Sequence, residues 1–101
     1  MTIIPIDKFV MGFLYRHKDT EVNSLLEEIY SHIQQVFGDV SIRLAVVRDP
    51  KSMDIYESLF VFVQTTLNLT ESIKLLDKFD EWWLDNMSMA NNLIAVDVEF
   101  I

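Results

Sequence analysis

The sequence predicts one α+β domain over residues 1–101, in which two amino-terminal helices precede a strand, a strand, a helix and a strand that form a three-stranded mixed sheet. Apolar residues recur at helical spacing in residues 6–36 and again in 68–85. A period of two appears instead in three segments, 40–47, 55–65 and 93–101. Half of the residues are hydrophobic and only four are Gly or Pro, two of each, which excludes a disordered chain.

Two apolar stripes predict the amino-terminal helices. The first helix covers residues 6–15, with Pro5 available as its first helical residue. In the second, Thr20 can cap the amino end, and Gly38 ends the helix because glycine accepts the left-handed conformation. The apolar stripe of the second helix consists of Val22, Leu25, Leu26, Ile29, Ile33 and Val36.

The strand at 55–65 is apolar on both of its faces, so both should be covered. One face carries Phe60 and Phe62, and the other carries Leu59, Val61 and Val63. This pattern places the segment in the middle of the sheet, although an order with strand 40–47 in the middle stays open. The turn before it is expected at residues 49–52.

The third helix should begin after a capping residue, either Asn68 or Thr70, and run to Asp85. A loop at 87–92 then leads to the last strand. A helix between two strands of one sheet predicts a right-handed crossover, so strands 55–65 and 93–101 should be parallel.

The third helix contains the motif Phe79-Asp80-Glu81-Trp82-Trp83-Leu84-Asp85. With this motif, the segment from residue 40 to the end resembles a group of small uncharacterised bacterial proteins that have a hairpin, a helix carrying Phe-Asp-x-x-Trp-Trp-Leu-Asp and a final strand. The resemblance implies the fold of this segment and a bacterial cytoplasmic setting. It implies no catalytic residues, because that group brings no established activity.

Charge and composition exclude several classes of function. Sixteen acidic residues against eight basic ones give a net charge of −8, which repels nucleic acid and anionic lipid. No apolar run approaches the ~20 residues of a membrane-spanning helix. The chain has no cysteine, hence no disulfide and no thiolate nucleophile or ligand. We therefore expect a cytoplasmic protein without cofactor, and we identify no catalytic residues.

The sequence predicts a homo-oligomer, most simply a homodimer. A sheet face with Leu59, Val61 and Val63 would leave a large apolar surface unless the first helix or another subunit lies on it. We expect that face to form the interface together with Phe9 and Phe13 of the first helix. Whether this helix packs on its own sheet or on a neighbour's stays open.

Trp82 is the predicted anchor of the interface. Trp82 and Trp83 are about 100° apart on a helix, so both cannot point straight at one sheet. Trp83 lies near the centre of the apolar arc and Trp82 at its edge, where an exposed indole could contact a partner. The alternative is that Trp82 packs under the loop at 87–92.

The expected function is a non-enzymatic protein-interaction domain, and its acidity suggests a basic protein partner, as for an inhibitor or antitoxin. The alternative is a module that binds a small ligand or a divalent metal through Asp80, Asp85, Asp97 and Glu99. The sequence shows no metal-binding spacing for these acids. His17 and His32 likewise have no partners at a catalytic or metal-binding spacing.

Overall fold

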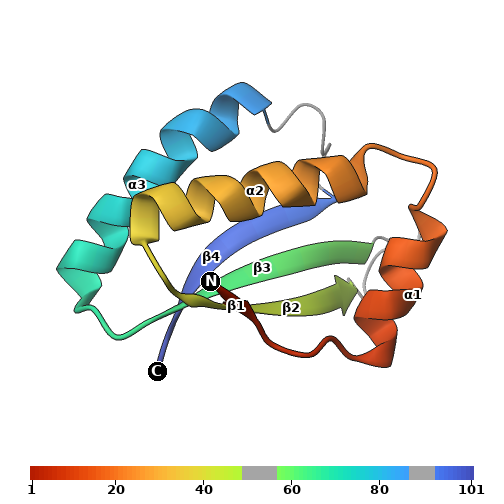
Figure 1. Ribbon diagram of the computed structural model, residues 1–101, viewed down its shortest axis with the longest axis horizontal. Helices are drawn as coiled ribbons and strands as arrows, with labels where there is room; N and C mark the ends of the chain where they lie inside the picture. The colour runs from red at the N-terminus through yellow and green to blue at the C-terminus, as the bar shows by residue number, and fades with distance from the viewer. Residues whose placement is uncertain (49–56, 87–92) are drawn as a thin grey trace.

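The computed structural model describes residues 1–48, 57–86 and 93–101. In these ranges the chain forms a layer of three helices on one face of a four-stranded mixed sheet (Figure 1). In chain order the elements are β1 (Thr2–Ile3), α1 (Lys8–Arg16), α2 (Val22–Phe37), β2 (Ser41–Arg48), β3 (Glu57–Thr65), α3 (Leu69–Asn86) and β4 (Ile94–Phe100). The α+β class is confirmed.

The strand order is β1-β2-β3-β4, so β3 lies between two partners as expected. β3 is antiparallel to β2 and parallel to β4, which confirms the crossover through α3. The prediction of three strands is wrong by one strand. Thr2 and Ile3 form a short strand that pairs in parallel with Ser41 and Ile42. This strand was not predicted, because two residues are too few to show a periodicity.

The start of α1 also differs from the prediction. The helix begins at Lys8, and Asp7 caps it by accepting a hydrogen bond from the Val10 N–H at 2.9 Å. A carboxylate at this position satisfies one of the free N–H groups of the first turn. Pro5 therefore lies before the helix and is not its first residue.

The other helix boundaries agree closely with the sequence. The cap residue of α2 is Glu21, one residue after the predicted Thr20, whose hydroxyl accepts a hydrogen bond from the Val22 N–H at 3.3 Å. Gly38 ends that helix with a φ of 81°, a conformation that glycine adopts without a steric penalty. Asn68, and not Thr70, caps α3 through a 2.8 Å hydrogen bond from the Glu71 N–H to Oδ1. The expected turn at 49–52 and loop at 87–92 lie outside the described residues.

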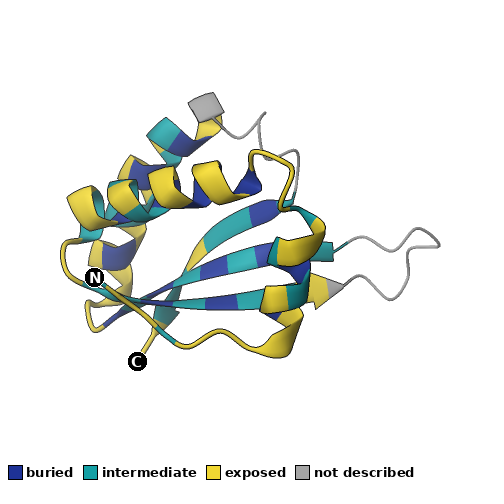
Figure 2. Cartoon of the chain, turned by 45° about the vertical axis from the view of Figure 1, so that its right-hand side comes forward, coloured by how far each residue is buried: buried dark blue, intermediate teal, exposed yellow. Residues whose placement is uncertain are grey.

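The hydrophobic core lies between the helices and one face of the sheet, where buried residues of both layers meet (Figure 2). The sheet contributes Ile42 and Leu44 from β2, Leu59, Val61 and Val63 from β3, and Ile94 from β4. The helices contribute Val10, Phe13, Val22, Leu25, Leu26, Ile29, Ile33, Phe79 and Trp83. α1 therefore packs on its own sheet, which answers the question that the sequence left open.

An ion pair fixes α1 against this same face. The Arg16 guanidinium donates a hydrogen bond to the Glu57 carboxylate at the beginning of β3. Glu57 has the same strand parity as Leu59, so its side chain lies on the side of the sheet that faces the helices. All described helices thus share one side of the sheet, and they cover one of the two faces of β3.

Candidate functional site

The opposite side of the sheet, called here the open face, carries the strand residues that point away from the helices. They are Ser41, Arg43, Ala45 and Val47 of β2, Ser58, Phe60, Phe62 and Gln64 of β3, and Ala95, Asp97 and Glu99 of β4. The register between strands sets residues of β2, β3 and β4 side by side, and each such set of neighbours across the sheet is called here a row. None of the helices in residues 1–48, 57–86 and 93–101 packs on these rows.

Two aromatic rings occupy the centre of the open face. Phe60 and Phe62 lie on the central strand with ring centroids 5.6 Å apart and an angle of 18° between the ring planes. Both rings remain partly exposed. Ala45 and Ala95 flank Phe60 in its row, so small side chains leave the ring accessible from above. The result is an apolar centre of the kind found in protein interfaces.

Charged residues lie on both sides of Phe62. In its row, Arg43 stands on β2 and Asp97 on β4. The Arg43 guanidinium carbon is 4.5 Å from the centroid of the Phe62 ring, at a distance where the cation is attracted to the ring face. The row therefore has a basic residue on β2, an aromatic residue on β3 and an acidic residue on β4.

A hydrogen-bond network fixes the arginine. Arg43 Nε and Nη2 each donate to the Glu99 carboxylate at 3.0 Å, and Gln64 Nε2 donates to Glu99 Oε2 at 3.2 Å. These bonds lower the pKa of Glu99, and the bond from Arg43 to Glu99 raises the pKa of Arg43. Both groups are thus charged at neutral pH, and the bidentate geometry orients the guanidinium across the central strand.

Four of the six residues predicted for the interface lie in the core. Leu59, Val61, Val63 and Phe13 are all 0% exposed within the single chain, so no second molecule can contact them without unfolding. The prediction chose the wrong face of β3: the helices cover the face with Leu59, Val61 and Val63 and leave the face with Phe60 and Phe62 open.

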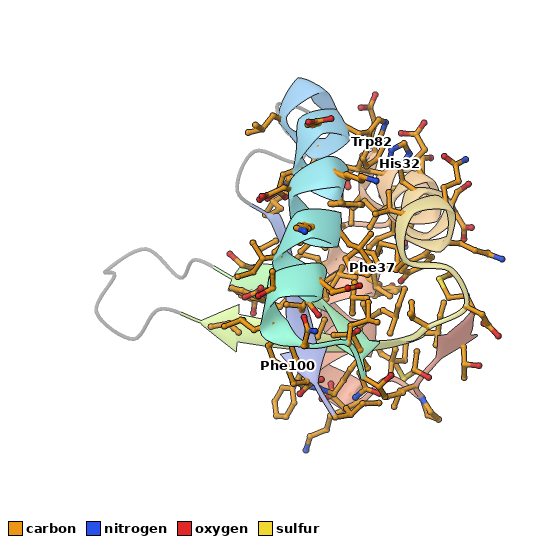
Figure 3. All side chains as sticks on the ribbon, turned by 90° about the vertical axis from the view of Figure 1, so that its left-hand side faces the viewer. His32, Phe37, Trp82 and Phe100 are labelled. Atoms are coloured by element: carbon orange, nitrogen blue, oxygen red, sulfur yellow. The ribbon has the colours of Figure 1, made fainter. Side chains whose placement is uncertain are left out.

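The other two predicted interface residues lie on the helices. Phe9 on α1 is 58% exposed and stays on the surface. Trp82 is partly buried between α3 and α2, where its indole stacks on the His32 ring with centroids 4.2 Å apart and planes at 16° (Figure 3). Trp82 therefore finds its second contact on α2, a position that helical angles alone could not reveal. Glu28, Ser31, His32 and Trp82 line a shallow hollow of about 270 Å³.

The acids of the predicted ligand site do not converge. Glu99 is bound by Arg43 and Gln64 on the open face. Partial burial raises the pKa of Asp80, and repulsion from Asp77 and then from Asp97 raises it further. The Asp85 side chain lies outside the described residues. Within the described ranges, no group of three His, Asp or Glu side chains is close enough to hold a metal ion.

A second hollow of about 330 Å³ lies where β2 begins and β3 ends. Its walls are Phe37, Asp39, Val40, Ser41, Gln64, Thr65, Thr66, Leu67 and Ile101. The Asp39 carboxylate is held by the terminal ammonium of Met1 at 2.6 Å, and the Thr65 hydroxyl accepts a hydrogen bond from the Leu67 N–H. Both side chains therefore already have partners within the chain.

Comparisons of the chain with protein-family models, with curated proteins and with solved structures find no match. Among the described residues, no helix is both long enough and apolar enough to cross a membrane.

Arg43, Phe60 and Phe62 were not predicted as site residues. The sequence does contain a signal for this face: Ser41 and Arg43 alternate with apolar residues in one strand, and Asp97 and Glu99 do so in another, which indicates a sheet face that meets water. Only the register between strands shows that Phe60 and Phe62 lie on that same face.

Proposed function

We propose that this protein is a non-enzymatic protein-interaction domain that forms a homodimer through the open face of its sheet. One observation carries the proposal: the described helices all lie on one side, and Phe60 and Phe62 are left at the centre of the other. Burial of such apolar surface is the main driving force for association. Contiguous apolar surface on a sheet is typical of an interaction site.

The charges of the open face favour a second copy as the partner. An isologous interface needs a surface that is complementary to itself. The basic residue on the β2 side and the acids on the β4 side give the open face this property. The net charge of −8 supports a basic protein as the rival partner, but such a partner would not need Arg43 on the contact surface.

The free edge of β4 is a less suitable surface for self-association. Asp97 Oδ1 accepts a hydrogen bond from the Val98 N–H at 2.8 Å, which occupies a donor that a new strand would need. Asp80 lies close to the same edge and already experiences repulsion from Asp97. Pairing of two β4 edges would bring a second set of these carboxylates to the contact.

The test is the solution mass, measured by light scattering and sedimentation over a range of concentrations. We expect a dimer for the natural chain and a monomer for Phe62→Glu, because the substitution places a charge at the desolvated centre. Leu84→Glu is the matched control, since Leu84 is 66% exposed on α3 and lies off the sheet. A monomeric natural chain, or loss of the dimer in Leu84→Glu alone, would overturn the proposal.

A further inference from the structure

We infer that the two copies are related by a two-fold axis parallel to β3, so that Arg43 of each chain faces Asp97 of the other. This inference rests on the proposed dimer and specifies its geometry. It follows from the register of the open face, in which Arg43, Phe62 and Asp97 form one row across β2, β3 and β4.

A face-to-face sheet dimer has two simple choices for the direction of its axis. An axis along β3 leaves each row opposite the same row of the partner and exchanges β2 with β4. Phe62 then meets the partner's Phe62, and Arg43 meets the partner's Asp97. An axis across the strands sets β2 against β2, so that Arg43 meets either a second Arg43 or Ala45.

The axis along β3 is favoured because it pairs opposite charges twice. Juxtaposed like charges at an interface cost several kcal/mol, whereas complementary ones fix the register. Either axis gives the aligned packing of stacked sheets, with strand directions within about 30° of each other, so the charges decide between the two axes. The network around Glu99 holds the Arg43 guanidinium over Phe62, within the row that also contains Asp97.

The apolar row beside this one fits the same axis. Ala45, Phe60 and Ala95 lie across the three strands, so the axis sets Ala45 opposite the partner's Ala95 and Phe60 opposite Phe60. The small side chains on both sides of Phe60 leave space into which the two facing rings can tilt.

A charge-swap experiment on the full chain tests the axis. Arg43→Glu alone would set two acids opposite each other at both symmetric contacts, and Asp97→Arg alone would do the same with two arginines. We expect each variant to dimerise at least about tenfold more weakly than the natural chain. An equimolar mixture should recover a heterodimer, because each of its two contacts again joins opposite charges.

Cross-linking gives a second measurement if Arg43→Glu, which loses the bond to Glu99, fails to fold. The chain has no cysteine, so Ala45→Cys and Ala95→Cys introduce single thiols. With a short bis-maleimide, the mixture should form covalent dimers and Ala45→Cys alone should form few. Efficient self-linking of Ala45→Cys, or no recovery in the charge-swap mixture, would overturn the axis while the dimer stands. A monomeric natural chain would overturn the dimer itself.

Discussion

The core-facing side of β3 and its open side differ in side-chain type as well as in burial. Leu59, Val61 and Val63 are aliphatic and 0% exposed, while Phe60 and Phe62 are aromatic and partly exposed. On the neighbouring strands β2 and β4, aliphatic residues lie on the core-facing side, whereas Arg43, Asp97 and Glu99 lie on the open side. The comparison teaches that a strand apolar on both faces does not need two helix layers, since the described helices cover one face of β3 and leave the phenylalanine face open.

The largest effect expected from this comparison is on stability. Leu59→Ala should lower the free energy of unfolding by about 3 kcal/mol, because it leaves a cavity under the helix layer. Phe60→Ala should cost clearly less at a concentration at which the protein is monomeric, although more atoms are removed, because its ring is partly exposed. Urea denaturation of both variants measures the difference. Equal losses would contradict the assignment of the two faces.

A smaller effect is expected on the helix side of the core. Among the described residues, Ser72 of α3 is 0% exposed and its Oγ has no hydrogen-bond partner. An unpaired buried hydroxyl carries a desolvation penalty, so Ser72→Ala should raise the free energy of unfolding by about 1 kcal/mol. Thermal and urea unfolding measure this gain. The exposed Ser24 of α2, changed to Ala, is the control and should shift stability much less; a destabilised Ser72→Ala would mean that the hydroxyl is paired.

The smallest effect is expected at the rim, where α3 meets the β4 edge. Burial, Asp77 and Asp97 raise the pKa of Asp80 in the folded protein. An acid with a raised folded pKa binds protons more tightly when folded, so stability falls as pH rises through that pKa. Asp80→Asn should therefore stabilise the protein at pH 7, by no more than about 0.5 kcal/mol since solvent screens this partly exposed group.

The gain in stability from Asp80→Asn should disappear at a pH below the ordinary aspartate pKa of about 3.9, because Asp80 is then protonated in both the folded and the unfolded chain. Denaturation of the natural chain and the variant at several pH values checks this dependence. A gain that does not change with pH would mean that the amide acts by packing and not by removing charge.

Local signals predicted the helices and strands well. Asn68 and Gly38 act at the positions where capping chemistry places them, and the two apolar faces of 55–65 indicated a strand with a partner on each side. Trp83 lies in the core as its place in the apolar arc indicated. The position of Trp82 was not predictable, because its stacking partner His32 lies on a helix that is distant in sequence.

The sequence by itself determined the α+β class, the boundaries of most elements and the parity within each strand, because these depend on neighbours a few residues away. Tertiary structure alone decided which face of β3 the helices cover, since a shift of one residue in register exchanges the two faces of a strand. The helices cover the face of β3 that contains Leu59, because aliphatic residues of β2 and β4 lie beside Leu59 on that face. Phe62 stays open, because the charged residues of β2 and β4 lie beside it on the other face.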